Sequence, residues 1–266
     1  MENLLRIAVE AALKAGREIM NVYLDPNQDF GIEIKSDRSP LTKADKAAHK
    51  CIVNHLSPTG IPILSEEGML PPYEVRRNWH RVWVVDPLDG TREFIKKNGE
   101  FTVNIGLVED GSPVLGVILV PVTGMLYFGI VGMGTWKTVL PLLKADYPEF
   151  EFGNSKALPQ KCNAEEAFVI VASRSHLNAE TEEYIQQARA QHRVVQLISS
   201  GSSLKMCLVA EGTADVYPRF APTMEWDTAA GNAIIRAAGK QVVDARTGQP
   251  LSYNKPDLHN PWFIVQ

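Results

Sequence analysis

The sequence predicts a layered α/β fold, in which helices cover the faces of β-sheets. Three observations lead to this prediction: two segments with helical hydrophobic periodicity come first, a series of apolar strands follows, and strands then alternate with helices. Such alternation is typical of sheets covered by helices. With 266 residues, the chain is long enough to bury a full hydrophobic core.

The first 150 residues are expected to form an α+β half. Apolar residues recur with helical spacing in the N-terminal segment, and interspersed charges argue against a signal peptide. A second helix is predicted over residues 43–56, after Pro40. Strands are predicted at residues 61–64, 82–85, 102–108, 114–120 and 125–131. The last two lie within residues 111–136, which carry no charged residue but contain six glycines and two prolines. Turns between buried strands therefore explain this stretch better than a membrane span.

Residues 151–266 are expected to form a second, α/β half, and the two halves to make one compact catalytic unit. A polar, irregular stretch over residues 144–160 marks the expected boundary. Strands are predicted at residues 167–172, 194–198, 214–217 and 241–243. Helices are predicted from Asn178, as the N-cap, to about residue 190, and over residues 202–210 and 226–238.

Charge and composition exclude several classes of protein. Lys and Arg number 27 against 31 Asp and Glu, a formal net charge of −4, which argues against a protein that coats nucleic acid. Hydrophobic residues make up 45% of the chain and charged residues 22%, a composition too apolar for disorder. The three cysteines form no metal-binding spacing, and their number favours a reducing compartment. We therefore expect a soluble cytoplasmic protein.

The most informative segment is an acidic turn at residues 86–91 (DPLDGT), directly after a predicted buried strand. Asp86 and Asp89 lie three residues apart on this turn, so their carboxylates can converge on a hard cation such as Mg²⁺. The Leu88 carbonyl can add a ligand, and the amides of Gly90 and Thr91 can face an anion. Taken alone, a simple surface turn is the more common interpretation of such dipeptides.

Three further acidic residues strengthen the metal interpretation. Glu66 follows the strand predicted at residues 61–64, so that a carboxylate again lies at a strand end. Asp227 stands at the start of an apolar helix, where an N-cap is the simplest alternative. Asp45 could equally be a solvated acid in the first turn of its helix. Together these carboxylates would repel one another without cations, because like charges raise each other's pKa.

Four motifs, in this order, resemble the inositol monophosphatase superfamily of Mg²⁺-dependent, lithium-sensitive phosphatases. They are residues 40–45 (PLTKAD), 65–67 (SEE), 86–91 (DPLDGT) and 226–231 (WDTAAG). Further segments are similar to the CysQ-type 3'(2'),5'-bisphosphate nucleotidases: residues 93–96, 98–104, 173–176, 201–205 and 217–220. The resemblance covers essentially the whole chain. It implies an α-β-α-β-α layered sandwich, with most metal ligands in residues 1–150 and substrate recognition in residues 151–266.

The resemblance also implies a role for individual residues. It assigns two or three Mg²⁺ ions to a set of ligands: Glu66, Asp86, the Leu88 carbonyl, Asp89 and Asp227. Catalysis falls to Asp45, Glu66 and Thr91, with Asp45 and Thr91 positioning the attacking water. The scissile phosphate is expected at the amides of Gly90 and Thr91, so that the substrate-binding set includes Glu66, Leu88, Asp89, Gly90, Thr91 and Asp227.

A nucleoside bisphosphatase needs a second anion site, for the phosphate that it does not cleave. Ser202, Ser203 and Lys205 open a predicted helix and provide hydroxyl groups and a cation. Arg219, at the end of a predicted strand, could add a planar cation. The alternatives are a solvated lysine and a surface arginine, and the two serines are not distinguished. His176 could contact the adenine, or be a capping or surface histidine.

The expected reaction is Mg²⁺-dependent hydrolysis of 3'-phosphoadenosine 5'-phosphate (PAP) to AMP and phosphate. The resemblance implies the sulfated form, PAPS, as a second substrate, and a place in sulfur assimilation. We expect a small-molecule nucleotide partner, no nucleic acid and no integral membrane span, with peripheral association at the inner face of the cell membrane as an option. The oligomeric state is left open.

Two alternatives stay open at this stage. An inositol or sugar-phosphate phosphatase of the same superfamily would be favoured if Lys205 and Arg219 proved remote from the metal ligands. A non-catalytic nucleotide- or metal-binding regulator is disfavoured, because a degenerate site should have lost at least one of its acidic residues.

Overall fold

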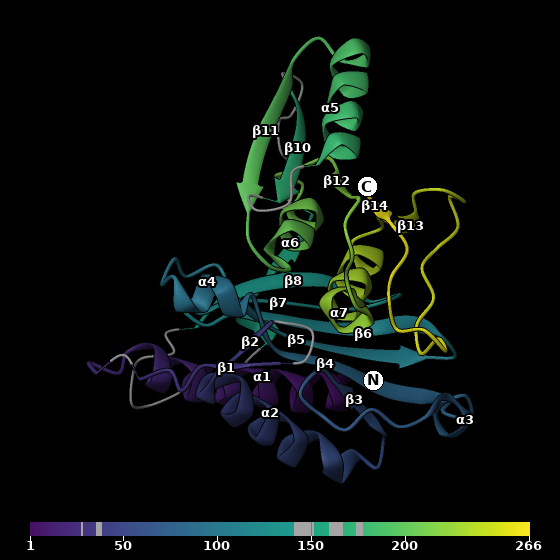
Figure 1. Cartoon of the computed structure of the whole chain (residues 1–266). Coiled ribbons are helices and arrows are strands. Elements are labelled where there is room, and N and C mark those ends of the chain that lie inside the picture. The colour runs from purple at the N-terminus through teal and green to yellow at the C-terminus, as the bar shows by residue number, and fades with distance from the viewer. Residues whose placement is uncertain (28, 36–38, 141–149, 151, 160–166, 174–177) are drawn as a thin grey trace.

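A seven-stranded sheet forms the centre of the computed structural model, with strand order β3-β4-β5-β6-β7-β8-β9 (Figure 1). The structure describes residues 1–266 except 28, 36–38, 141–149, 151, 160–166 and 174–177. Its strands are β3 Ile63–Ser65, β4 Arg81–Asp89, β5 Thr102–Glu109, β6 Ser112–Val120, β7 Met125–Ile130, β8 Gly134–Val139 and β9 Lys156–Leu158. Strands β3 and β4 run parallel, and every later neighbouring pair is antiparallel.

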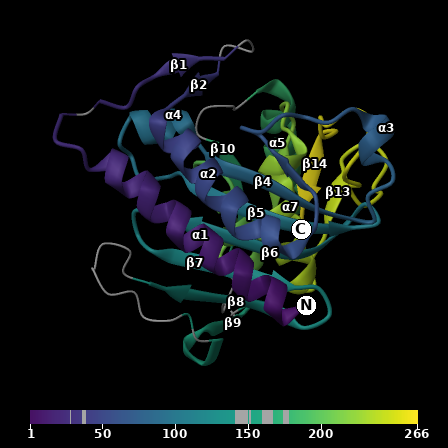
Figure 2. The same ribbon diagram turned by 90° about the horizontal axis from the view of Figure 1, so that it is seen from below.

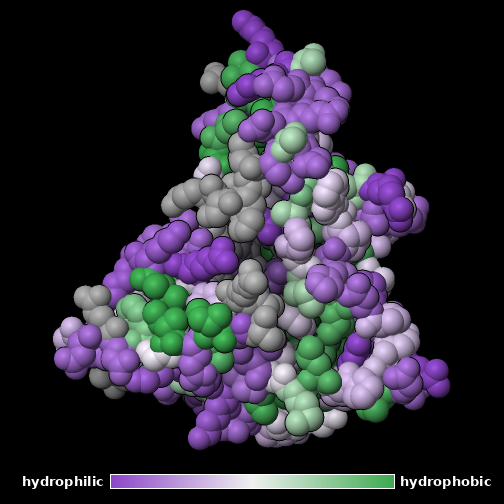
Figure 3. Space-filling view, in the orientation of Figure 1, coloured by the Kyte–Doolittle hydropathy of each residue, from purple (hydrophilic) through white to green (hydrophobic). Residues whose placement is uncertain are grey.

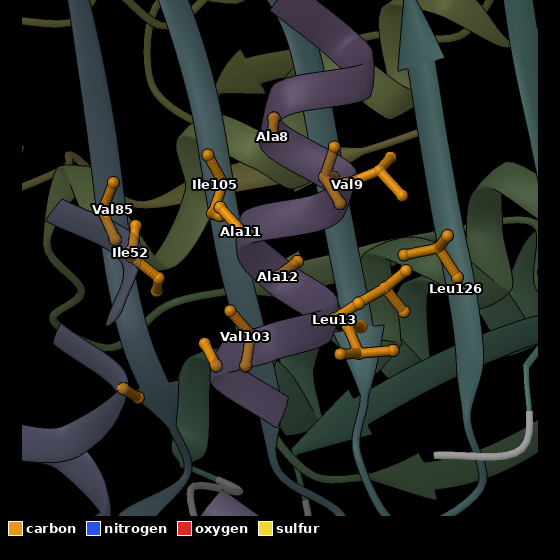
Figure 4. Close-up of a cluster of buried hydrophobic side chains, with 14 of the residues drawn as sticks. Ala8, Val9, Ala11, Ala12, Leu13, Ile52, Val85, Val103, Ile105 and Leu126 are labelled. Atoms are coloured by element: carbon orange, nitrogen blue, oxygen red, sulfur yellow. The ribbon is translucent and has the colours of Figure 1, made fainter. Parts of the chain in front are cut away.

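Two helices, α1 (Glu2–Tyr23) and α2 (Lys43–Leu56), lie side by side on one face of this sheet (Figure 2). Ala8, Ala11 and Ala12 of α1 are fully buried. They belong to the same hydrophobic cluster as Val103 and Ile105 of β5 (Figure 4). Small side chains on the buried stripe allow the helix to approach the sheet closely, and larger residues such as Leu13 fill the spaces beside them.

The opposite face of the sheet is covered by α7 (Glu225–Ala237), with α6 (Leu204–Glu211) beside it. Two strand glycines make room for α7. A Cβ atom at Gly116 would lie 2.1 Å from the carbonyl oxygen of Ala230, and one at Gly106 would lie 2.8 Å from its amide nitrogen. The helix therefore rests directly on β5 and β6, which fixes the position of its first turn relative to the end of β4.

A second β layer lies beyond these helices. Strands β10 (Phe168–Ser173) and β11 (Val195–Ser200) are parallel. The antiparallel strands β12 (Tyr217–Arg219), β14 (Phe263–Val265) and β13 (Val242–Asp244) continue the layer, and an isolated bridge between Ile170 and Val216 joins the two groups. Helix α5 (Ala179–Gln191) packs on the outside (Figure 1). The α-β-α-β-α layering is confirmed.

The remaining elements are short. They are β1 Glu33–Ile34, β2 Pro40–Leu41, α3 Tyr73–Arg76, α4 Thr91–Ile95, and the 3₁₀ helices Ser57–Thr59 and Phe152–Asn154. Strands β1 and β2 pair with each other. Helix α4 begins at Thr91, the last residue of the DPLDGT segment.

Most predicted elements are confirmed, and their errors lie at the ends. Helix α2 has the predicted bounds, and the Asn178 side chain caps α5 by accepting a hydrogen bond from the Thr181 amide at 3.1 Å. Helix α6 begins two residues later than expected. Strand β12 begins only at Tyr217, because the preceding amides of Asp215 and Val216 donate to the Val169 carbonyl.

Strands β8, β9 and β14 were not predicted. Strand β9 lies after residue 150 and pairs with β8, so a segment from the second half of the sequence completes the central sheet. The division of the chain at residue 150 stays a prediction. Residues 144–149, 151 and 160 of the irregular stretch 144–160 lie outside the described residues.

The charge-free stretch 111–136 forms β6, β7 and the start of β8, joined by turns. Among the described residues, no helix has both the length and the apolar character needed to cross a membrane. The face shown in Figure 3 is largely hydrophilic, with hydrophobic residues gathered in separate patches.

Candidate active site

Four element ends surround one cavity of about 140 Å³. They are the end of β4, the start of α6, the end of β12 and the start of α7. The predicted site residues that line this cavity are Asp89, Gly90, Ser202, Ser203, Lys205, Arg219 and Asp227. Acidic residues therefore face basic residues across a single space, although they are far apart in the sequence.

Residues 86–89, predicted as part of a turn, form the irregular end of β4, which reaches Asp89. The pairing of β4 with β5 shifts register between Asp86 and Asp89, and Asp86 Oδ1 accepts a hydrogen bond from the Leu88 amide at 3.0 Å. Gly90 has φ +94°, which favours glycine. The chain can then turn into α4 and bring Thr91 back towards the start of α2.

Asp45 is buried at the start of α2, with 1% exposure. Its Oδ2 accepts hydrogen bonds from the Thr42 amide at 2.7 Å and the Thr42 hydroxyl at 2.5 Å, completing a capping box. Its Oδ1 accepts a hydrogen bond from the Thr91 hydroxyl at 3.2 Å. The alternative of a solvated first-turn acid is wrong. Asp45 and Thr91 are in direct contact, so an acid and a hydroxyl lie close enough to bind the same water.

Glu66 follows β3 and is held by a cation that the sequence analysis did not identify. Lys35, just after β1, donates from Nζ to Glu66 Oε1 at 2.7 Å and also to Glu67. Burial alone would lower the pKa of Lys35, but the bonds to both glutamates raise it above its ordinary value. No local pattern could reveal this pairing, because Lys35 is an isolated lysine in a polar loop.

Asp227 lies in the first turn of α7, where its Oδ2 accepts a hydrogen bond from the Met224 amide at 2.8 Å. The N-cap of α7 is Met224, so the expectation that Asp227 is the N-cap is wrong by three residues. Asp227 instead accepts the N-cap amide from the third helical position, and its side chain also lines the cavity. Burial, followed by the charge of Asp89, raises the pKa of Asp227 to about 8. Trp226, which precedes it, is 7% exposed and belongs to a core cluster.

The acidic cluster (Asp45, Glu66, Asp86, Asp89 and Asp227) is electrostatically strained without counter-ions. Burial first, and then the charges of the other four carboxylates, raises the pKa of Asp86 well above its ordinary value. Burial also raises the pKa values of Glu66 and Asp45. A divalent cation would relieve this repulsion, and carboxylate and carbonyl oxygens are the ligands that Mg²⁺ prefers. The donor set therefore fits the expected metal.

These carboxylates are not arranged around one ion as they stand. In the part of the chain that the structure describes, no group of three or more His, Cys, Asp or Glu side chains converges into a ligand set. The contacts given above explain why: Glu66 is held by Lys35, while Asp86 and Asp227 each accept a hydrogen bond from a nearby amide. A metal ion would have to replace these contacts to bind all of the carboxylates together.

The basic pair (Lys205 and Arg219) lies on the other side of the cavity. Lys205 is 5% exposed, and its Nζ donates to the carbonyls of Ser202 at 2.6 Å and Ser200 at 3.3 Å. Burial lowers the pKa of Lys205 to about 8. The alternative of a solvated helix lysine is therefore wrong.

Arg219 ends β12 and lines the cavity, so it is not a surface-loop charge. Its Nη2 donates to the Pro222 carbonyl at 3.3 Å. Its Nε is buried and has no hydrogen-bond partner among the described residues. A buried donor without a partner is costly, so this atom favours a bound acceptor in the cavity.

The structure separates the two serines that the sequence could not. Ser203 Oγ lies 2.8 Å from Asp89 Oδ2 and 2.9 Å from the Asp227 carbonyl, so it belongs to the acidic side. Ser202 has φ +42° and its Oγ lies 3.3 Å from Thr102 Oγ1. His176 lies outside the described residues, so its role in contacting adenine stays a prediction.

Sequence reasoning gave no role to Glu93 and Tyr217, which also line the cavity, or to Thr102 and Asn104, which contact the serines. The last two could have been noticed. They are polar residues that alternate with apolar ones along β5, so they share one face of the sheet.

Comparison with known proteins places this geometry in a family. The model of the Inositol monophosphatase family matches residues 1–262. The chain is 47% identical over 259 residues to a Shigella flexneri protein named 3'(2'),5'-bisphosphate nucleotidase CysQ, covering 96% of each chain. It is 46% identical, with the same coverage, to the protein of that name in Escherichia coli K12.

Solved structures agree with these relatives. The structure is similar to that of CysQ from Bacteroides thetaiotaomicron, with a TM-score of 0.90, 54% identity and coverage of 100% of this chain and 97% of that one. The suhB protein of Bartonella henselae shares the fold, with a TM-score of 0.71, 25% identity and coverage of 99% and 92%. The cavity with its acidic and basic sides thus lies in a protein that belongs to the inositol monophosphatase family.

Proposed function

We propose that this protein is a Mg²⁺-dependent 3'(2'),5'-bisphosphate nucleotidase that hydrolyses PAP to AMP and phosphate. One observation carries the proposal: Lys205 and Arg219 line the same cavity as Asp89 and Asp227. A bisphosphate needs a cationic site for the phosphate that stays and a metal-binding site for the phosphate that leaves. An inositol monophosphate has only one phosphate, so it would leave the basic pair without an anion.

The relatives support the same assignment. The Shigella flexneri and Escherichia coli proteins, at 47% and 46% identity, bear the name 3'(2'),5'-bisphosphate nucleotidase. The motif residues of the acidic cluster are all present in this chain. A non-catalytic regulator would be free to lose one of them, so the intact set favours an enzyme.

The residues divide the work of binding and hydrolysis. Lys205, Arg219 and Ser202 bind the 5'-phosphate, and the amides of Gly90 and Thr91 bind the 3'-phosphate. Asp45 and Thr91, joined at 3.2 Å, hold a water in line with the scissile bond. Water adds to phosphorus, the bond between phosphorus and the ribose oxygen breaks, and one proton of the water passes to that oxygen, giving the 3'-hydroxyl of AMP and inorganic phosphate. Two or three Mg²⁺ ions, held by Glu66, Asp86, the Leu88 carbonyl, Asp89 and Asp227, would neutralise the phosphate charge.

Phosphate release from five substrates tests the proposal: PAP, PAPS, 3'-AMP, inositol 1-phosphate and fructose 1,6-bisphosphate, each with Mg²⁺ and with EDTA. We expect the highest kcat/KM for PAP, lower but measurable turnover of PAPS, and no activity with EDTA. Faster turnover of inositol 1-phosphate or fructose 1,6-bisphosphate would favour the sugar-phosphate phosphatase. No release from any substrate at saturating Mg²⁺ would favour the regulator.

Several expectations go with this proposal and rest on the sequence. They are the cytoplasmic location, peripheral association with the inner face of the membrane, the absence of a nucleic-acid partner, and the place in sulfur assimilation. Fractionation of cells into cytosol and membranes would test the first two directly.

A further inference from the structure

A buried chain of polar side chains connects the basic side of the cavity to the acidic side. It consists of Thr102 and Asn104 on β5 and Ser203 before α6, with exposures of 0%, 1% and 4%. The Thr102 hydroxyl donates to Asn104 Oδ1 at 2.9 Å, and Asn104 Nδ2 donates to Ser203 Oγ at 2.9 Å. Ser203 Oγ then lies 2.8 Å from Asp89 Oδ2. None of the three has an assigned role in the chemistry described above, apart from the undivided assignment of Ser203 to phosphate.

Counting protons fixes the direction of this chain. Ser203 has one hydroxyl proton, and its oxygen already accepts from Asn104, so it donates either to Asp89 Oδ2 or to the Asp227 carbonyl at 2.9 Å. The carboxylate is the stronger acceptor, because hydrogen bonds to charged groups are the strong ones. Asn104 Nδ2 also lies 3.4 Å from Asp89 Oδ2. The two donors therefore converge on one oxygen of Asp89.

The orientation of Asn104 follows from the same neighbours. The Asn104 Nδ2 atom faces two oxygens, Ser203 Oγ and Asp89 Oδ2, and the Asn104 Oδ1 atom faces the hydroxyl of Thr102. A reversed amide would place its oxygen against the Asp89 carboxylate. The side chain is thus held in one orientation by partners at both ends, as an outer ligand of a metal site would be.

We propose that Asn104 and Ser203 are positioning residues that orient Asp89 for metal binding. They occupy Oδ2 of Asp89 and leave Oδ1 to bind the ion. The proposal rests on the proposed function, because it assumes that Asp89 binds a metal. It also removes Ser203 from the phosphate-binding set: its proton is used by Asp89, whereas the Ser202 hydroxyl can donate to an incoming 5'-phosphate.

The first measurement is metal affinity in the absence of substrate, using Mn²⁺ as a spectroscopic substitute for Mg²⁺ and detecting free Mn²⁺ by electron paramagnetic resonance. We expect Asn104→Ala and Ser203→Ala to weaken Mn²⁺ binding by about 10- to 100-fold, the usual cost of losing an outer partner of a ligand. Ser203→Thr keeps the hydroxyl and should restore most of the affinity.

The matched control is Asn232→Ala. Asn232 is 2% exposed in α7, and its Nδ2 donates to the Tyr253 hydroxyl at 2.9 Å rather than to a residue that contacts a carboxylate of the acidic cluster. This variant loses a buried amide just as Asn104→Ala does, so it should lower stability in urea and leave Mn²⁺ affinity unchanged. If Asn104→Ala does not fold, Ser203→Ala, which removes only one oxygen, carries the test.

The second measurement compares kcat/KM for PAP and 3'-AMP. Because Ser203 and Asn104 act through Asp89, their alanine variants should lose the same factor with both substrates. A loss confined to PAP in Ser203→Ala would show that Ser203 binds the 5'-phosphate and would overturn the proposal, as would unchanged Mn²⁺ affinity in both variants. Weaker Mn²⁺ binding in an enzyme that proves inactive towards PAP would sustain this inference while the proposed function fails.

Discussion

The two sides of the cavity are built in different ways. On the acidic side, three of the five carboxylates are held by amides close to them in the chain: Asp45 by Thr42, Asp86 by Leu88 and Asp227 by Met224. The other two, Glu66 and Asp89, are contacted by Lys35 and Ser203 from distant parts of the chain. On the basic side, Lys205 is bound to carbonyls but depends on tertiary packing for its burial, and the buried Nε of Arg219 has no partner among the described residues. Local turns therefore place most of the acidic side, whereas the burial of the basic pair depends on packing between elements.

The largest loss of activity should follow from a substitution on the acidic side. Asp89→Asn removes a charge from the expected ligand set and should lower kcat/KM equally for PAP and 3'-AMP. The loss should exceed the roughly 10- to 100-fold cost typical of an outer-shell change. The variant should unfold in urea much like the wild type, because Asp89 ends a strand at the edge of the cavity rather than in the core. Near-normal turnover at saturating Mg²⁺ would contradict the metal assignment.

A substitution on the basic side should lower kcat/KM only for the substrate with two phosphates. Lys205→Ala removes a charge-assisted contact, typically about 1.5–3 kcal/mol, which corresponds to roughly ten- to hundred-fold in kcat/KM for PAP. The change with 3'-AMP should be small, because that substrate has no 5'-phosphate.

The control for this variant is Lys156→Ala, which removes an exposed lysine on β9 and should alter neither substrate. Equal losses for PAP and 3'-AMP in Lys205→Ala would mean that Lys205 supports the fold of the cavity instead of binding phosphate. The difference between the two sides of the site would then disappear.

The same contrast explains what the sequence could predict. Capping residues, the acidic turn and the hydrophobic stripes of α1 and α2 depend on neighbours within a few positions, so pattern analysis found them. Asp227 was weighed as a helix cap or a metal-site residue, and Asp45 as a solvated acid or a site residue. The structure shows that each accepts a hydrogen bond from the N-cap amide of its helix, while Asp227 lines the cavity and Asp45 contacts Thr91. A local role at the start of a helix therefore does not exclude a role in the site.

The features that the sequence missed depend on partners far away in the chain. Lys35 meets Glu66 across 31 positions, and Asn104 meets Ser203 across 99. Strand β14 is only three residues long, and its place between β12 and β13 comes from pairing with both neighbours. The burial of Lys205 could not be deduced either, since a lysine in a helix is ordinarily solvated.

A smaller change in substrate preference should appear when the pH is raised. Because burial lowers the pKa of Lys205 to about 8, this residue loses its charge above pH 8, and kcat/KM reports ionisations of the free enzyme. The 5'-phosphate is already dianionic there, since its second pKa is about 6. The ratio of kcat/KM for PAP to that for 3'-AMP should therefore fall from pH 8 to pH 9, by at most about tenfold. In Lys205→Ala the ratio should stay flat, and a parallel fall in that variant would assign the ionisation to another group.

The smallest effect is on the free energy of unfolding. It should rise with pH, whereas the kcat/KM ratio for the two substrates should fall. The pKa of Lys205 is about 8 in the folded protein and 10.5 for an ordinary lysine, so between these values the unfolded chain binds more protons. The free energy of unfolding should therefore rise with pH in this window, by at most about 1.4 kcal/mol per pH unit from this residue. Below pH 8 both states hold the proton, and the cost of the buried charge is constant.

Urea unfolding of the wild type and of Lys205→Met at pH 7.5, 8.5 and 9.5 isolates this contribution, because other titrating groups cancel in the difference. Methionine is unbranched and can fill the same space without a charge. The stability of the wild type relative to the variant should increase as the pH rises. Bound AMP should reduce the increase, because its 5'-phosphate would hold the proton on Lys205 in the folded state. A difference that is constant from pH 7.5 to 9.5 would mean that Lys205 keeps its charge in the cavity, and the pH dependence expected for PAP would then also be wrong.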